Sequence, residues 1–126
     1  MAALEAKYPG VVFVYMTGHA DGTGLEGTLH KNNQQIRSWC VENNKWLFDF
    51  YDIECYDPDG NYYGDKSVDD ECNYTDGSTS GNWATEWQDA NPGKWYDCYS
   101  AHSKAINANL KAYAAWQLFS AIAKEF

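Results

Sequence analysis

The apolar residues of this chain form two compact runs that predict strands. Six apolar or aromatic residues follow one another from Val11 to Met16, and glycine-rich sequence closes the run. A run of this kind is typical of a strand that is buried on both faces of a parallel sheet. A second run, from Trp46 to Phe50, has the same character. We therefore predict two parallel strands.

Between these runs the apolar residues keep helical spacing. Thr28 is a predicted N-cap, and Ile36 and Trp39 lie on one face of a helix predicted over residues 29–43. Two parallel strands joined by a helix form a right-handed βαβ unit. The sequence therefore predicts a βαβ core over residues 11–54.

The carboxyl-terminal part of the chain predicts a long helix. From Ser103 onward there is no glycine or proline, and apolar residues recur at helical spacing from Ile106 to Ile122. A helix with so wide an apolar stripe must pack on a sheet or on a partner. His102 stands at the amino end of this helix, predicted over residues 102–125, where backbone N–H groups favour anions.

Residues 55–99 show neither the apolar runs of a buried strand nor the apolar spacing of a helix. They are rich in Gly, Asn and Asp, and they predict an irregular insertion between the βαβ core and the terminal helix. Only residues 82–90 predict a short helix, with Trp83 and Trp87 one turn apart. The 126 residues suffice for one domain with a core and are too few for two. The fold class that we predict is α/β.

The four cysteines could pair in three ways. Cys72 and Cys98 bracket the irregular segment, and a bond between them would stabilise the fold by roughly 3–4 kcal/mol. Cys40 and Cys55 are expected at opposite edges of the sheet, beyond the spacing of about 7 Å that a disulfide tolerates. We predict a Cys72–Cys98 disulfide, two free cysteines and an oxidising, extracellular compartment.

Composition narrows the classes of ligand. The net charge of −9 disfavours nucleic acid, which needs a basic face. No apolar stretch reaches the roughly 18 residues that span a bilayer. Aromatic residues make up 17% of this acidic chain, and aromatic and acidic surfaces together suit neutral sugars. Trp83, Trp87 and Trp95 are the candidate sugar platform; the alternative is that these rings are core.

Polar side chains at the carboxyl ends of the two strands are the candidate catalytic residues, because ligands of open α/β sheets bind there. His19 follows the first strand, and Asp49, Asp52 and Glu54 follow the second. We predict that His19, Asp52 and His102 lie near one another. One of these groups would act as a general base on water, or two of the carboxylates would form a glycosidase pair. The alternative is that Asp49 or Asp52 caps a turn.

Two metal sites are further possibilities. His19, His102 and a carboxylate match a 2-His-1-carboxylate set, although no HxH or HExxH spacing supports it. A stretch that begins at Asp57 looks like a calcium loop, but an EF-hand needs glycine at its sixth position and glutamate at its twelfth, whereas here Gly60 is fourth and Val68 is twelfth. A looser calcium site remains possible, with a solvated turn as the alternative. Its candidate ligands are Asp57, Asp59, Asn61 and Asp65.

The order of the motifs resembles the C-terminal half of the SGNH/GDSL hydrolase fold, in a secreted bacterial subgroup. The motifs are TGH at 17–19, NNQQIR at 32–37, LFDFYDIE at 47–54 and AHSKAIN at 101–107. The resemblance implies a truncated three-layer, flavodoxin-like sandwich that acts on esters, often acyl groups on carbohydrate. It also implies that His102 is the catalytic histidine.

This chain departs from the SGNH pattern in two places. Tyr99 stands where the family has an aspartate three residues before the histidine, and the nearest acid is Asp97. The GDS nucleophile block and the glycine and asparagine oxyanion blocks are absent. The predicted function is a carbohydrate-related hydrolase or a truncated remnant of one. The alternative is a non-catalytic carbohydrate-binding module.

The predicted architecture also bears on assembly. A sheet of two strands has open edges that invite pairing, and the terminal helix carries more apolar surface than two strands can cover. We predict a homodimer, the commonest closed oligomer. The alternative is a monomer in which residues 56–99 fold back over the open face.

Overall fold

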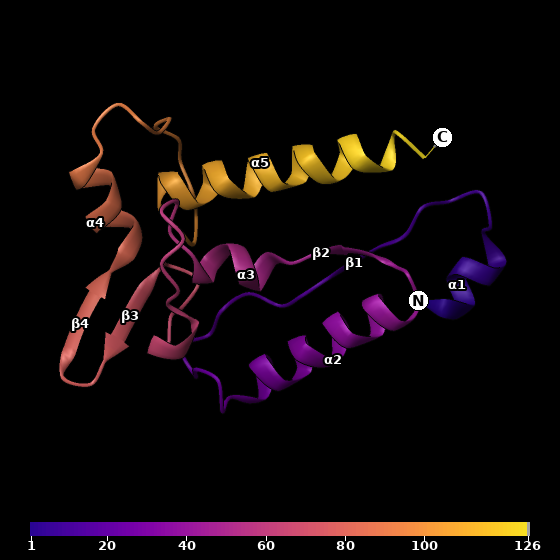
Figure 1. The fold of residues 1–126 in the computed structure, drawn as a ribbon, viewed down its shortest axis with the longest axis horizontal. Coiled ribbons are helices and arrows are strands. Elements are labelled where there is room, and N and C mark those ends of the chain that lie inside the picture. The colour runs from indigo at the N-terminus through magenta and orange to yellow at the C-terminus, as the bar shows by residue number, and fades with distance from the viewer. Residues whose placement is uncertain (126) are drawn as a thin grey trace.

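Two short parallel strands form the centre of the computed structural model, which describes residues 1–125 (Figure 1). β1 (Val14–Met16) pairs with β2 (Trp46–Phe48) in parallel, with Tyr15 opposite Leu47. α1 (Ala2–Lys7) precedes β1, and α2 (Thr28–Glu42) connects the two strands. The predicted parallel pair and its connecting helix are confirmed.

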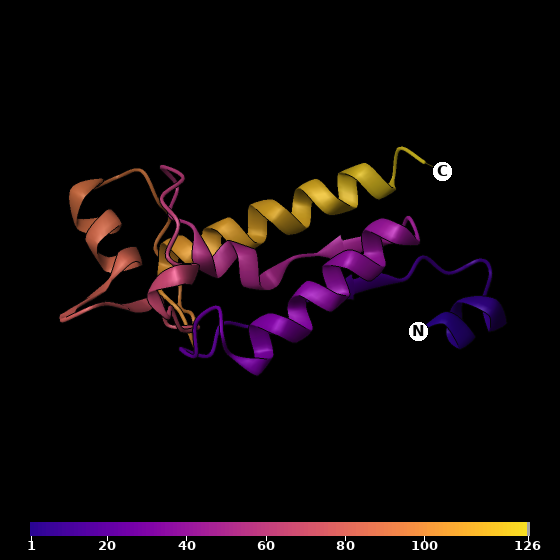
Figure 2. The same ribbon diagram turned by 60° about the horizontal axis from the view of Figure 1, so that its bottom comes forward.

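The longest helices flank this sheet. α5 (Ala105–Ile122) lies above the strands and α2 below them in Figure 1, and in the turned view of Figure 2 α2 passes in front of the strands. α3 (Phe50–Cys55) follows β2 directly and packs against α5. The mixed α/β class is confirmed. Two strands are too few to establish the three-layer sandwich of SGNH hydrolases.

Both strands are shorter than predicted. Residues 11–13 lie outside β1, and Val11 is exposed. β2 ends at Phe48 because Asp49 caps α3: its carboxylate accepts a hydrogen bond from the Asp52 backbone N–H at 3.3 Å. Capping by aspartate starts a helix where the apolar run alone predicts continued strand.

The insertion is more ordered than predicted, which corrects our expectation of an irregular segment. It holds the 3₁₀ helix η1 (Gly64–Lys66), the hairpin β3 (Asn73–Asp76) and β4 (Thr79–Asn82), and α4 (Trp83–Ala90). Gly77 opens the two-residue turn of the hairpin with φ of +61°, a conformation that favours glycine. The helix predicted over residues 82–90 is confirmed.

The buried core lies where the insertion meets α3 and the start of α5. Trp83 is 1% exposed, and its indole N–H donates to the Glu54 carbonyl at 3.0 Å. Trp83 therefore belongs to the core and cannot serve as part of a sugar platform. The other members of this cluster are Ala20, Tyr51, Cys55, Val68, Cys72, Ala84 and Ile106.

The predicted Cys72–Cys98 disulfide is wrong in this structure, where all four cysteines are free. The Cys72 thiol faces the Ser103 hydroxyl at 3.6 Å, whereas the Cys98 thiol faces the Ala105 carbonyl at 3.9 Å. The hairpin and the Trp83 contacts hold the insertion without a crosslink. The expected extracellular location loses its support from a disulfide and stays a prediction.

We expect only one of these thiols to react in the folded protein. Cys98 is exposed, whereas Cys40, Cys55 and Cys72 are buried, and burial raises the pKa of Cys55 and of Cys72 to about 12. Because the thiolate is the reactive form, iodoacetamide should label Cys98 alone without reductant, and all four thiols in urea. A Cys72–Cys98 linked peptide in the unreduced digest would restore the disulfide.

An apolar face of α5 remains uncovered. Tyr113, Trp116 and Phe119 are all exposed along this helix. Among residues 1–125, no helix is long and apolar enough to cross a membrane. The predicted homodimer stays a prediction, and this face of α5 is the surface on which it would form.

Candidate functional site

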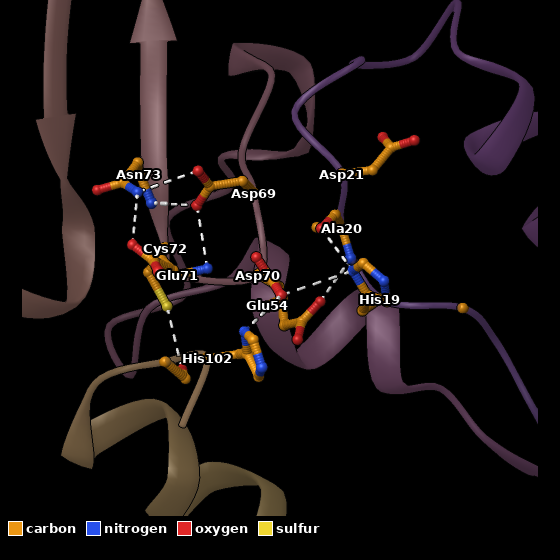
Figure 3. A network of polar contacts seen from close by, with 12 residues as sticks. His19, Ala20, Asp21, Glu54, Asp69, Asp70, Glu71, Cys72, Asn73 and His102 are labelled. Carbon is orange, nitrogen blue, oxygen red and sulfur yellow. Dashed lines mark hydrogen bonds and ion pairs between the residues drawn. The ribbon is translucent and has the colours of Figure 1, made fainter. Parts of the chain in front are cut away.

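Two histidines from distant parts of the chain flank one carboxylate (Figure 3). Asp70 Oδ2 lies 3.8 Å from His19 Nδ1 and 3.9 Å from His102 Nδ1. Both distances suit ion pairs and exceed those of hydrogen bonds. Both imidazoles are exposed, while Asp70 is partly buried. The Nε2 atom of each ring is thus the one left for a substrate.

A second contact fixes the proton on His19. Its Nδ1 atom lies 2.9 Å from the carbonyl oxygen of Ala20. A carbonyl oxygen only accepts hydrogen bonds, so Nδ1 carries the proton and donates it. When the ring is neutral, this places the lone pair on Nε2, which is the form that a general base requires.

The chain brings His19 beside Asp70 through a short β-like contact. Asp21 and Asp69 form an isolated antiparallel bridge, and the Gly22 N–H donates to the Val68 carbonyl at 3.1 Å. The Asp69 carboxylate accepts from the backbone N–H groups of Glu71 and Asn73, at 3.0 and 2.9 Å, and so shapes the turn that carries Asp70.

The segment that carries His102 is held by its neighbours. The Ser103 hydroxyl donates to Asn107 Oδ1 at 2.8 Å and contacts the Cys72 thiol. Asn107 is buried on the first turn of α5, and its amide donates to the Ile53 carbonyl at 2.8 Å. These contacts tie the start of α5 to the turn of Asp70 and to α3.

The Glu54 side chain links the segment that carries His19 to helix α5, which follows His102 in the chain. Its side chain is fully buried, and Oε2 accepts from the Ala20 N–H at 2.6 Å. Oε1 accepts from Lys111 Nζ of α5 at 2.8 Å. Burial raises the pKa of Glu54, and the contacts with Lys111 and the Ala20 N–H oppose this effect. The Lys111 ammonium also lies 4.2 Å from the centre of the Phe50 ring.

These side chains surround an open hollow of about 610 Å³, which we call the histidine hollow. Its polar lining consists of two imidazoles, two carboxylates, one ammonium and two hydroxyls, and Phe50 supplies an apolar wall. Its lining residues are His19, Phe50, Glu54, Asp70, Ser100, Ala101, His102, Ser103 and Lys111.

Of the residues predicted as catalytic, the structure brings His19, Glu54 and His102 together. Asp52 does not line the histidine hollow, contrary to our prediction. Its carboxylate lies 3.4 Å from Arg37 Nη2, and burial and the neighbouring Asp49 raise its pKa. Its side chain is about half exposed on α3.

Asp49 has a structural role. Arg37 donates to both of its carboxylate oxygens, at 2.6 and 3.0 Å, and the Thr17 hydroxyl donates at 2.9 Å. These donors fix the carboxylate in place as the cap of α3. Asp49 and Asp52 thus lie at Arg37 and do not line the hollow to which Glu54 belongs.

The predicted calcium ligands satisfy the backbone of their own loop. Asp57 accepts from the N–H groups of Asp59 and Asn61, both at 2.9 Å, and Asp59 accepts from the Trp87 indole at 2.9 Å. Among residues 1–125, no three His, Cys, Asp or Glu side chains are arranged to hold a metal ion. Neither the 2-His-1-carboxylate site nor the calcium site, for which Asp65 of η1 was also a candidate ligand, gains support.

Sequence reasoning missed Asp70 and Lys111. Asp70 sits in the acidic run 69–71, where no periodicity marks one acid above its neighbours. Lys111 is the only charged residue between Ala105 and Ile122 on α5. A single charge within so apolar a helix was the signal that could have been followed.

The two serines of the hollow, Ser100 and Ser103, are not paired with a histidine in the part of the chain that the structure describes. Ser103 donates to Asn107, and no hydrogen bond joins a serine to a histidine within residues 1–125. Ser100 lines the hollow without such a contact. Nucleophilic catalysis needs the hydroxyl within reach of its base, so the arrangement favours direct attack by water.

Comparison of the chain with protein-family models, with curated proteins and with solved structures found no match. The resemblance to SGNH hydrolases therefore stays a hypothesis that rests on the quoted motifs.

Proposed function

We propose that the protein is a hydrolase that uses His19 and His102 as an acid–base pair on a carbohydrate or a carbohydrate ester. The observation that carries the proposal is that two imidazoles flank the single carboxylate of Asp70 at an open hollow. Hydrolysis needs one group that accepts a proton and another that donates one, and this arrangement supplies both.

In the proposed reaction His19 Nε2 takes a proton from a water molecule as its oxygen attacks the carbonyl or acetal carbon. Protonated His102 gives its proton to the oxygen of the leaving alcohol as the bond to that oxygen breaks. The products are an acid and an alcohol from an ester, or two sugars from a glycoside. Asp70 offsets the positive charge that passes between the two rings.

The carbohydrate part of the proposal rests on composition and on the surroundings of the site. The net charge of −9 disfavours polyanionic substrates, aromatic residues make up 17% of the chain, and Phe50 gives the hollow an aromatic wall. The finer fold, a truncated SGNH-type sandwich, belongs to the same proposal. Its support is the motif order and the position of His102 just ahead of α5.

A panel of chromogenic acyl esters and glycosides tests the proposal. We expect turnover of at least one class, and we expect His102→Ala to lower it by about 10²–10⁴-fold. His30→Gln is the matched control, because His30, the third histidine of the chain, lies on α2, contacts Tyr51 of α3 and does not line the hollow. Full activity in His102→Ala would remove His102 from the reaction.

The second candidate function is a non-catalytic carbohydrate-binding module, which the partly buried Trp87 and Trp95 favour. In that case oligosaccharide should quench tryptophan fluorescence without being consumed.

A further inference from the structure

A second hollow adjoins the histidine hollow on the far side of residues 100–103. It has a volume of about 520 Å³, and it shares Ser100 and Ser103 with its neighbour. Trp95 and Tyr99 supply its aromatic lining, so we call it the aromatic hollow. Because the two hollows share a wall, one extended ligand can occupy both.

The backbone that carries the two rings is held in place. Asn109 of α5 accepts from the Tyr96 N–H at 2.7 Å and donates to the Tyr96 carbonyl at 3.1 Å. Asn109 is itself buried. On the other side, Gln88 of α4 accepts from the Ile106 N–H at 2.9 Å. These contacts fix the walls before a ligand arrives, which lowers the cost of binding.

Trp95 packs against the buried core, whereas the Tyr99 ring lies at the surface. Tyr99 is 92% exposed. The Trp95 indole N–H is the one buried polar side-chain atom without a partner among residues 1–125, although a buried indole N–H usually finds an acceptor. Internal hydrogen bonding therefore does not set the position of this ring.

The charges of the aromatic hollow suit a neutral ligand. One carboxylate, Asp97, and one ammonium, Lys104, line it together with the amide of Gln88. Opposite charges balance, so neither an anion nor a cation is favoured. Aromatic faces, an amide and balanced charges match a polyhydroxylated ring, which offers an apolar face and many hydroxyl groups.

We propose that the aromatic hollow binds a further sugar unit of the substrate, so that the protein acts on oligosaccharide chains rather than on single sugars. This inference rests on the proposed hydrolase function, because the histidine hollow would hold the reacting unit. The chain would pass over Ser100 and Ser103 and stack on Tyr99 and Trp95.

The test compares Tyr99→Ala with Tyr96→Ala, using cellohexaose and chitohexaose as probes. Tyr96 is also exposed, at 74%, but does not line the hollow. Affinity is measured by tryptophan fluorescence in the His102→Ala background, where turnover should be about 10²–10⁴-fold slower. We expect Tyr99→Ala to weaken binding of one probe roughly tenfold, the effect of losing an aromatic anchor, and Tyr96→Ala to have no effect. With active protein, Tyr99→Ala should raise KM for an acylated oligosaccharide and leave a small chromogenic ester unchanged.

Equal affinities in the two variants, or no binding of either probe, would overturn the aromatic hollow as a sugar site, even if the small ester is still hydrolysed. Binding that depends on Tyr99 in a protein without hydrolytic activity would support the sugar site and reject the hydrolase. The two proposals therefore fail by different results.

Discussion

Replacing Asp70 by asparagine should lower kcat by about 10²–10⁴-fold, the range for loss of a positioned acid–base function. The carboxylate faces Nδ1 of both histidines. Asparagine keeps the size of the side chain and removes the charge, so the imidazolium that forms during the reaction loses its counter-charge. KM should change little, because Asp70 faces the rings rather than the substrate.

The folding of this variant should be close to that of the wild type. Within residues 1–125, Asp70 accepts no hydrogen bond, and ion pairs of this exposure contribute at most about 1 kcal/mol. Asp89→Asn is the matched control, since Asp89 is an exposed residue of α4. An Asp70→Asn protein with unchanged kcat would show that the two histidines do not depend on their shared carboxylate.

Replacing Lys111 by methionine should destabilise the protein by about 3–5 kcal/mol at pH 7, the usual effect of breaking a buried ion pair by removing one partner. Lys111 donates to Glu54 at 2.8 Å, and the Glu54 side chain is 0% exposed. Methionine keeps the apolar stem on Phe50 but leaves the carboxylate without its cation. Urea unfolding measures the loss.

The loss of stability caused by Lys111→Met should be smaller at low pH. Burial raises the pKa of Glu54 above its ordinary value of 4.5, so the folded chain binds the proton more tightly than the unfolded chain. The stability gained from this protonation is fully present below about pH 4.5 and is lost as pH rises through the folded-state pKa. Without Lys111 the pKa rises further, so the difference from wild type should be larger at pH 7 than at pH 4.5.

A double variant separates the effect of the unpaired Glu54 charge from the effect of altered packing on Phe50. Adding Glu54→Gln to Lys111→Met removes the unpaired charge and should recover much of the stability at pH 7. A loss that is the same at pH 4.5 and pH 7 would contradict the charge-based explanation and assign the effect to packing on Phe50.

The sequence predicted the parts of the fold that depend on local pattern. The apolar runs at 11–16 and 46–50 and the helical spacing of α2, α4 and α5 were sufficient, because each element buries one face that the pattern reveals. The residues at which the strands begin and end were harder to predict. Asp49 stops β2 early because capping and the Arg37 contact outweigh the strand preference of Phe50 and Tyr51.

The candidate site was only partly predictable, for a physical reason. His19 and His102 could be placed because they adjoin a strand end and a helix start. Asp70 lies in a turn that is positioned by the Asp21–Asp69 bridge and by Cys72, and contacts of such long sequence separation leave no local pattern. The Cys72–Cys98 prediction was wrong for a related reason: the hairpin β3–β4 supports a segment that composition alone marks as unstructured.

The most direct test of the central claim, that His19 and His102 act together on one substrate, is the kcat/KM of four proteins: wild type, His19→Ala, His102→Ala and the double variant. Residues that act as a unit give strongly non-additive losses. We predict that each single variant loses about 10²–10⁴-fold and that the double variant is no slower than the slower single one. Losses that multiply in the double variant, or a single variant with full activity, would contradict the acid–base pair.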